Sequence, residues 1–140
     1  MITAVDTNIL VALWDSDSNT NTSAQEALDQ ASSIGKLVVS APVFAELLAS
    51  PGRDQDFLER FCADTEIAID WEINRKTWIA AGQAFQSYVA RRRAQHAAGA
   101  RRILADFLIG AHACENADQL LTLDKEIYQA AFPTLRLKYF

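Results

Sequence analysis

The first eight residues, MITAVDTN, constrain the fold more than any other stretch of the chain. A short run with β-branched residues ends in Asp6, and Thr7 and Asn8 follow it as a turn or helix-capping pair. A buried parallel strand presents an acid in this way at the carboxyl edge of a sheet, where α/β proteins bind ligands. Asp6 taken alone is equally typical of a helix N-cap. Its interpretation as a site residue therefore depends on the acids that follow.

Three later acids occupy comparable positions, each just past an apolar segment or at the start of a helix: Glu46, Asp106 and Asp124. Glu46 is expected about one turn into a helix that follows a short strand. Asp106 opens an apolar helical segment, where the helix dipole also favours an acid. Asp124 ends the apolar run that begins at Leu120. Four carboxylates in one crevice indicate a divalent cation.

Strand-like and helix-like patterns alternate along the chain. Strands are expected at the N-terminus and over 37–39, 67–70, 120–124 and 135–139; helices are expected over 22–33, 75–96 and 125–131, with a further helical stretch carrying 101–104. Such connections between strands imply crossovers. The pattern predicts a three-layer α/β/α domain with a mainly parallel sheet of about five strands. The length of 140 residues favours one domain, residues 1–140.

Composition indicates an ordinary globular protein, with 50% hydrophobic and 22% charged residues. The early apolar run 9–14 is far shorter than the roughly 20 residues of a membrane span. Cys62 and Cys114 form no CxxC or Cys/His motif and are interpreted as small buried hydrophobes of a reducing compartment. We therefore expect a cytoplasmic protein without a membrane partner.

The charge distribution is uneven. A net charge of -5 argues against a nucleic-acid partner, but five arginines concentrate positive charge in one short region: Arg91, Arg92, Arg93, Arg101 and Arg102. Arginines of this kind contact phosphates and position RNA without specifying its sequence. A solvated helix face is the alternative interpretation, so the cluster is only a candidate RNA-binding surface.

The residue types in the predicted crevice favour a hard cation. Carboxylate oxygens suit Mg²⁺ or Mn²⁺, whereas zinc or copper would require His or Cys at ligand spacing. His96 and His112 are the only histidines, and both are interpreted as surface or packing residues outside the site. A carboxylate cluster repels phosphate until bound cations reverse the local field. Activation of water and stabilisation of a leaving oxygen then become possible, which is the chemistry of a metal-dependent nuclease.

Four segments together resemble the PIN-domain family, in particular the VapC-like toxins of bacterial toxin-antitoxin systems. They are Asp6-Thr7-Asn8, Ala45-Glu46-Leu47, the segment DFLIGAHA at 106–113 and the segment LTLDKEIY at 121–128. The resemblance covers essentially the whole chain, in the same order and at similar spacing. It maps the family's acidic quartet onto Asp6, Glu46, Asp106 and Asp124, with Asp6, Asp106 and Asp124 as metal ligands. Asn8 and Thr122 match polar positions that support the metal site.

The resemblance implies a Mg²⁺- or Mn²⁺-dependent endoribonuclease that forms homodimers. It also implies inhibition by a small antitoxin whose C-terminal segment occupies the active-site groove. Gly110-Ala111-His112 departs from the family's usual run of small residues, which affects local packing.

Other functions remain open from the sequence. A catalytically inactive PIN domain that binds RNA or protein would be expected to have lost one or more acids of the quartet, and none is lost. A haloacid-dehalogenase-like phosphatase needs a second Asp where Asn8 stands. A receiver-like domain would need paired acids after its first strand and a key Lys after its last, and neither is evident.

Overall fold

A computed structural model of the protein describes residues 1–96 and 102–140. Within these residues the strands are β1 (Ile2–Val5), β2 (Lys36–Ser40), β3 (Ile67–Asp70), β4 (Gln119–Leu121) and β5 (Leu137–Lys138). The helices are α1 (Thr7–Trp14), α2 (Asn21–Ile34), α3 (Ala41–Leu47), α4 (Gln55–Asp64), α5 (Arg75–Ala94), α6 (Leu104–Asn116) and α7 (Lys125–Ala131).

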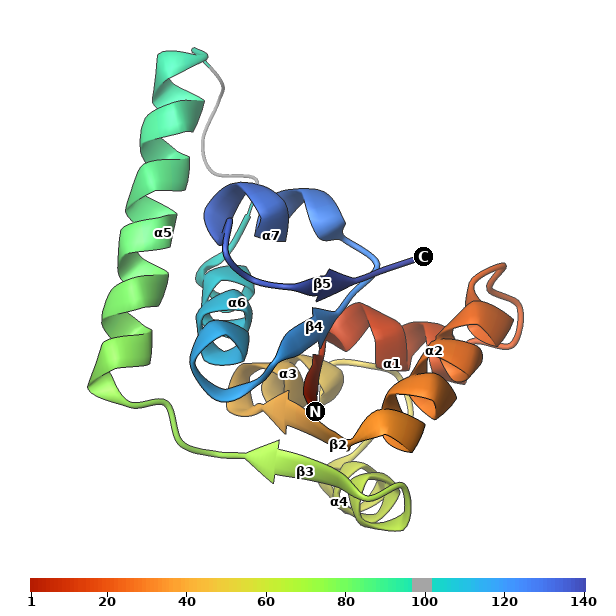
Figure 1. The fold of residues 1–140 in the computed structure, drawn as a ribbon. Helices are drawn as coiled ribbons and strands as arrows, with labels where there is room; N and C mark the ends of the chain where they lie inside the picture. Colours follow the sequence, from red (N-terminus) through yellow and green to blue (C-terminus); the bar gives the residue numbers. More distant parts are fainter. Residues whose placement is uncertain (97–101) are drawn as a thin grey trace.

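The strands form one sheet in the order β3-β2-β1-β4-β5, and every strand pairing in it is parallel. In Figure 1, α1 and α2 lie on one side of this sheet, and α5 and α6 lie on the other. The prediction of a three-layer α/β/α fold with a mainly parallel sheet of about five strands is confirmed.

The side on which successive strands are added to the sheet changes at β1. The chain runs from β1 to β2 and β3 on one side and then crosses to β4 and β5 on the other. Ligands bind outside the carboxyl ends of parallel strands at such a switch point. The backbone N–H of Asp6 donates to the carbonyl of Leu121 at 3.0 Å, so the ends of β1 and β4 lie side by side. The topology therefore places Asp6 next to the segment that carries Thr122 and Asp124.

Burial on both faces explains the apolar character of the central strands. Val5 is 1% exposed, and Leu120 and Leu121 are fully buried. Parallel strands covered by helices on both faces are typically continuous apolar runs. Thr3 is the buried polar exception in β1, and its Oγ1 accepts a hydrogen bond of 3.0 Å from the side-chain amide of Gln119 in β4.

Three details of the sequence interpretation were wrong or incomplete. The apolar run 9–14 belongs to α1, which begins at Thr7 with Asp6 as its N-cap. The helix predicted over 101–104 begins only at Leu104, after Arg102 and Ile103, and Arg101 lies outside the described residues. Cys62 is buried as expected, but Cys114 is exposed.

A membrane span was not expected from the sequence. Across residues 1–96 and 102–140, none of the helices combines the length and the apolar character that crossing a membrane requires.

Candidate active site

Asp6 is a buried acid at the end of β1, with 5% of its surface exposed. Its Oδ1 accepts the backbone N–H of Thr7 at 2.7 Å. Its Oδ2 accepts the hydroxyl of Thr122 at 2.7 Å, the hydroxyl of Tyr128 at 3.0 Å and the side-chain amide of Asn8 at 3.3 Å. These donors come from α1, the segment after β4, and α7. The orientation of the carboxylate is therefore fixed by three elements.

Burial raises the pKa of Asp6 to about 6. Hydrogen bonds from Thr122, Tyr128 and the backbone of Thr7 oppose this rise, whereas the charge of Glu46 adds to it. A carboxylate that is desolvated and faces another acid is destabilised in its charged form. A cation beside Asp6 would relieve that destabilisation.

Glu46 reaches the same region from α3. This helix begins directly after β2, with Ser40 in extended conformation at the N-cap and Pro42 in the first turn, where proline is tolerated. The hydroxyl of Thr7 donates to Oε1 of Glu46 at 2.7 Å. Thr7 therefore joins the two acids, through its backbone to Asp6 and through its side chain to Glu46.

Asp106 lies in the first turn of α6. Its Oδ2 accepts the backbone N–H of Ile103 at 3.4 Å, so the acid takes part in capping the helix. Burial raises the pKa of Asp106, and the charge of Asp124 raises it further. The hydrogen bond from Ile103 and the charge of Arg102 oppose the rise. Both a capping role and a role in the acid cluster are thus compatible with its position.

Asp124 occupies the N-cap position of α7, but its side chain makes no capping hydrogen bond there. Its Oδ2 lies 2.6 Å from Nη1 of Arg102 in an ion pair. Its backbone N–H donates to the hydroxyl of Thr122 at 3.0 Å. The fourth acid is therefore tied to Asp6 through Thr122, which contacts both residues.

Asn8 and Thr122 lie against Asp6, where the resemblance placed them. Besides Asp6, the amide nitrogen of Asn8 donates to Oγ1 of Thr122 at 3.4 Å. Its amide oxygen accepts the backbone N–H of Leu123 at 3.1 Å. Asn8 thereby links α1 to the segment between β4 and α7.

Sequence reasoning missed Thr7 and Tyr128 as parts of this site. Tyr128 is 1% exposed although its side chain carries a hydroxyl. Tyr128 follows Asp124 by four residues, which places both on one face of α7. That spacing was the available signal for Tyr128, and adjacency to Asp6 was the signal for Thr7.

Electrostatic effects connect all four acids. Burial raises the pKa of the Tyr128 hydroxyl, and the negative charges of Asp6, Asp106 and Glu46 raise it further. The negative charge of Asp124 likewise raises the pKa of Asp106. These effects, with the hydrogen bonds through Thr7 and Thr122, place the four predicted acids in one region beside the carboxyl ends of β1, β2 and β4.

The donor set of this cluster fits a hard divalent cation. It offers carboxylate, hydroxyl and amide oxygens without a thiol or imidazole, which is the ligand chemistry of Mg²⁺ or Mn²⁺. In the part of the chain that is described, no three His, Cys, Asp or Glu side chains are grouped closely enough to hold a metal ion as they stand. The ligand set Asp6, Asp106 and Asp124 therefore stays a prediction.

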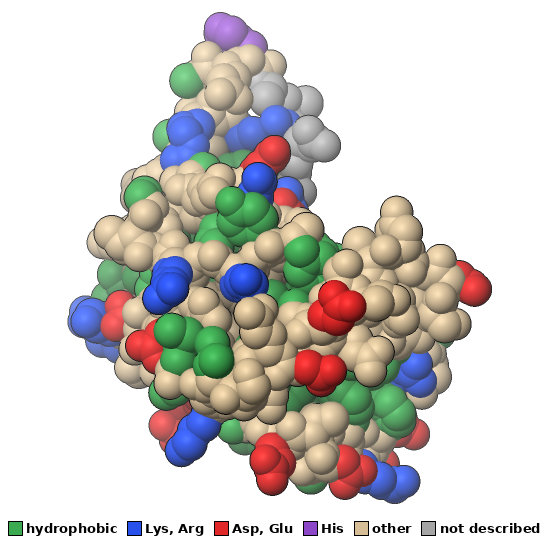
Figure 2. Space-filling model, turned by 45° about the vertical axis from the view of Figure 1, so that its right-hand side comes forward, with side chains coloured by type: hydrophobic (Ala, Val, Ile, Leu, Met, Phe, Trp, Pro, Cys, Tyr) green, Lys and Arg blue, Asp and Glu red, His purple; other side chains and the backbone are tan. Residues whose placement is uncertain are grey.

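The arginines predicted to bind RNA fall into two places. Arg91, Arg92 and Arg93 form the last turn of α5, whose far end projects beyond the rest of the molecule in Figure 1. Figure 2 shows blue Lys and Arg side chains on the stem of this projection. Arg102 instead pairs with an acid of the quartet, and Arg101 lies outside the described residues.

His112 is a packing residue, as the sequence analysis expected. It is 1% exposed, and its Nε2 lies 2.8 Å from Oδ2 of Asp70 at the end of β3. The contact joins α6 to the edge of the sheet. His112 is the position where the sequence departs from the family's small residues, and Asp70 is the partner that accommodates it.

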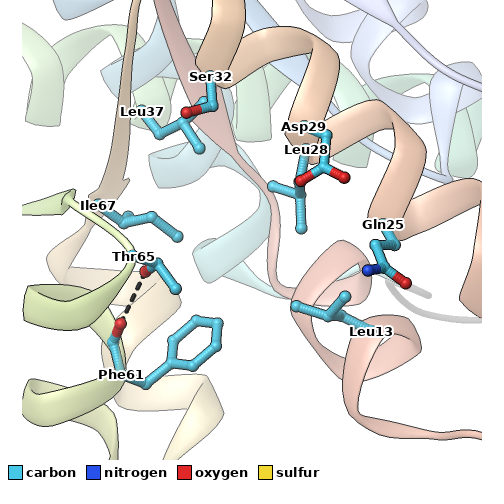
Figure 3. A pocket seen from close by; sticks show the side chains of 9 residues that line it. All are labelled: Leu13, Gln25, Leu28, Asp29, Ser32, Leu37, Phe61, Thr65 and Ile67. Atoms are coloured by element: carbon cyan, nitrogen blue, oxygen red, sulfur yellow. Dashed lines mark hydrogen bonds between the residues drawn. The ribbon is translucent and has the colours of Figure 1, made fainter.

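A separate cavity of about 320 Å³ lies between α2, α4 and the sheet (Figure 3). Leu28, Leu37, Phe61 and Ile67 make much of its lining apolar. The hydroxyl of Thr65 in its wall donates to the carbonyl of Phe61 at 2.7 Å. None of the four acids lines it, so this cavity is distinct from the candidate active site.

Comparisons with known proteins agree with this fold. Residues 3–133 match the family model of the PIN domain. No curated protein matches the chain. Among solved structures, the chain is similar to VapBC2 from Rickettsia felis bound to a DNA fragment from their promoter, with 23% identity and a TM-score of 0.67 over 100% of this chain and 99% of the other. It is similar to VapBC-1 from nontypeable Haemophilus influenzae, with 20% identity and a TM-score of 0.65 over 99% of this chain and 98% of the other. It is also similar to a toxin-antitoxin complex from Klebsiella pneumoniae, with 19% identity and a TM-score of 0.64 over 95% of this chain and 94% of the other. At these identities the likeness establishes the fold.

Proposed function

The chain belongs to the PIN-domain family, and from this premise we propose that it is a Mg²⁺- or Mn²⁺-dependent endoribonuclease. In this proposal residues 1–140 form one nuclease domain, which acts in the cytoplasm as the toxin of a toxin-antitoxin pair. The observation that carries the proposal is the buried carboxylate of Asp6, whose pKa is raised to about 6 beside Glu46. Perturbed carboxylates grouped at a switch point are typical of a functional site.

We assign the cation to Asp6, Asp106 and Asp124. When bound, a divalent cation lowers the pKa of a water ligand, polarises a phosphate oxygen and stabilises the leaving oxygen. Asp6 is held for this task by Thr122 and Tyr128.

The fourth acid, Glu46, is assigned to proton transfer. The hydroxyl of Thr7 donates a hydrogen bond of 2.7 Å to Oε1 of Glu46 and so orients this carboxylate. We assign Oε2 of Glu46 to accept the proton of the attacking water. Asn8 and Thr122 support the site by holding the end of β1 against the segment after β4.

Two alternatives are less well supported. An inactive PIN scaffold would have no need to keep three acids near a buried hydroxyl, yet the charges of Asp6, Asp106 and Glu46 all act on Tyr128. A haloacid-dehalogenase-like phosphatase is set aside by the match to a different family.

The toxin assignment is supported by the fold that the chain shares with a toxin-antitoxin complex from Klebsiella pneumoniae. In this proposal an antitoxin inhibits the nuclease, and two copies of the chain form a homodimer. Exposed apolar side chains offer a surface for self-association, because Trp71 is 55% exposed and Trp78 is 49% exposed. These two residues, with Pro42 of α3 and Leu108 of α6, line an open recess of about 420 Å³.

Cleavage assays test the proposed nuclease directly. The folded chain is incubated with a structured RNA in Mn²⁺, in Mg²⁺ or with excess EDTA, and with a DNA of the same sequence as a control. RNA should be cut only when a divalent cation is present, and DNA should remain intact. No RNA cleavage with either cation, or undiminished cleavage in EDTA, would overturn the proposal.

Growth assays test the toxin assignment separately. Expression of the wild-type chain in a bacterium should arrest growth, whereas Asp6→Asn should not. A short upstream reading frame that encodes a DNA-binding N-terminus and an amphipathic tail should restore growth when it is co-expressed. A cleaving enzyme that leaves growth unaffected would contradict the toxin assignment alone.

A further inference from the structure

Arg102 places a positive charge inside the acid cluster. Its Nη1 lies 2.6 Å from Oδ2 of Asp124, and the two side chains are 36% and 32% exposed. Its backbone N–H donates to the hydroxyl of Tyr88 in α5 at 3.1 Å. Arg102 precedes Asp106 by four residues. It therefore contacts the acid at the start of α7, and its charge also reaches the acid in the first turn of α6.

The charge of Arg102 acts on both of these acids. It forms an ion pair with Asp124, and its positive charge also acts on Asp106. A guanidinium is charged at every physiological pH, so this effect does not switch off. In the structure, Arg102 neutralises part of the negative charge that a divalent cation would otherwise neutralise.

We propose that Arg102 is an internal counter-ion that competes with the divalent cation for Asp124, so the Arg102–Asp124 contact holds the active site closed to the cation. This inference rests on the proposed function, because it concerns the cation assigned to the same acids. It adds a regulatory contact within the chain.

The guanidinium and a cation would compete for the same carboxylate at Asp124. Mg²⁺ binds carboxylate oxygens at about 2.0 to 2.1 Å and requires near-ideal octahedral geometry. Oδ2 of Asp124 already accepts a charge-assisted hydrogen bond from the guanidinium. A cation bound at this carboxylate would stand within a few ångströms of a second positive charge. Movement of the guanidinium away from Asp124 would therefore favour binding of the cation.

Departure of the guanidinium needs only a movement of the side chain. The backbone of Arg102 is anchored to Tyr88, but the ion pair itself is partly exposed on both sides. Partly exposed ion pairs contribute little to stability, because solvent screens them. A long arginine side chain can rotate into solvent while its backbone stays in place.

A purely structural role for Arg102 predicts a different result. If Arg102 served only to fasten α6 to α7, its loss would disorder Asp124 and weaken cation binding. Competition predicts the opposite, because removal of the positive charge leaves Asp124 available to the cation. The direction of the change in affinity therefore distinguishes the two roles.

The test is Mn²⁺ titration calorimetry on the folded full chain without RNA. Arg102→Gln should bind Mn²⁺ about tenfold more tightly than wild type, a size typical of coupled sites. Arg102→Lys keeps the charge and should stay within about twofold of wild type. Arg60→Gln is the matched control, because Arg60 is exposed on α4 and its replacement changes the net charge equally. Arg102→Met, which keeps the aliphatic stem, replaces the Gln variant if that variant does not fold.

The outcomes separate the inference from the proposed function. Wild-type binding that Asp6→Asn abolishes, with unchanged or weaker binding in Arg102→Gln, would overturn the competition alone. Absence of Mn²⁺ binding in wild type and in the Arg102 variants would overturn the proposed function and this inference together. Tighter binding in Arg60→Gln as well as in Arg102→Gln would reduce the effect to net charge and overturn the competition.

Discussion

The hydroxyl of Tyr128 donates a hydrogen bond of 3.0 Å to Oδ2 of Asp6, joining residues that are 122 positions apart in the sequence. The bond is buried and connects α7 to the end of β1. It lowers the pKa of Asp6 against the opposing effect of burial. Tyr128 is therefore a positioning residue for the acid at the centre of the site.

Tyr128→Phe should weaken Mn²⁺ binding and RNA cleavage by about tenfold or more, the usual effect of removing a residue that orients a metal ligand. The physical reason is that Asp6 loses a donor that favours its charged form. Tyr139→Phe is the control, because Tyr139 is 44% exposed. Equal affinity and activity in wild type and Tyr128→Phe would show that the hydrogen bond has no role in the site.

Asp6 should make the metal-free protein less stable as pH rises. Its pKa is about 6 in the folded state against an ordinary value of 3.8. A raised pKa gives a contribution to stability that is full below the ordinary value and is lost as pH rises through about 6. The loss is about 3 kcal/mol for a shift of this size.

Urea unfolding of wild type and Asp6→Asn, in EDTA at about pH 4 and about pH 8, measures this effect. The free energy of unfolding of the variant, relative to wild type, should increase by about 2 kcal/mol between the two pH values, because part of the effect is already lost at pH 4. Asp64→Asn, at an exposed position of α4, should show no such change. A pH-independent difference between Asp6→Asn and wild type would rule out the raised pKa.

Two glycines in helices should respond oppositely to alanine. A Cβ on Gly110 of α6 would clash with the ring of Phe132, which is itself buried, whereas a Cβ on Gly82 of α5 would meet nothing within 4 Å. Gly110→Ala should therefore destabilise the protein by about 1 to 3 kcal/mol through overpacking. Gly82→Ala should stabilise it by about 0.5 to 1 kcal/mol through helix propensity. Urea unfolding curves measure both, and changes of the same sign would contradict the packing described for α6.

The last turn of α5 should contribute to RNA binding through phosphate contacts. Replacement of Arg91 and Arg93 together by Ala should weaken RNA binding and reduce the slope of log affinity against log salt by about 1 to 2. RNA binding by catalytically inactive protein, titrated at several salt concentrations, gives this slope. Arg60→Ala is the control on α4. An unchanged slope would leave Arg91 and Arg93 as solvated residues of a helix end.

Local patterns made the central strands and the acids predictable. Asp6 and Asp124 each end a short apolar run, so the sequence alone indicated the edge of the sheet at which they lie. Tyr128 and Arg102 acquire their roles from contacts with Asp6 and Asp124 that only the folded chain creates. The contact of Arg102 leaves no periodic signal, and the four-residue spacing of Tyr128 from Asp124 does not by itself indicate the contact with Asp6.

Helix α1, which contains the apolar run 9–14, was not predicted for a related reason. In α1, Ile9, Leu10 and Ala12 are buried, but Val11 between them is 43% exposed. Because apolar residues cover almost every face of this short helix, its sequence lacks the 3.6-residue alternation that marks an amphipathic helix.

Asp106→Asn tests the central claim, that the acid cluster is a metal-dependent nuclease site, most directly. Asn keeps an oxygen that can accept the backbone N–H of Ile103, so a capping role alone predicts a loss of at most about 1 kcal/mol in stability with intact activity. Asp54→Asn is the matched control, because Asp54 caps α4 by accepting the N–H of Phe57 at 2.8 Å. The measurement is single-turnover cleavage of a structured RNA in Mn²⁺, with circular dichroism to verify folding. We predict that Asp106→Asn is folded and cleaves at least about 100-fold more slowly than wild type and Asp54→Asn; a folded Asp106→Asn that cleaves at the wild-type rate would contradict the account.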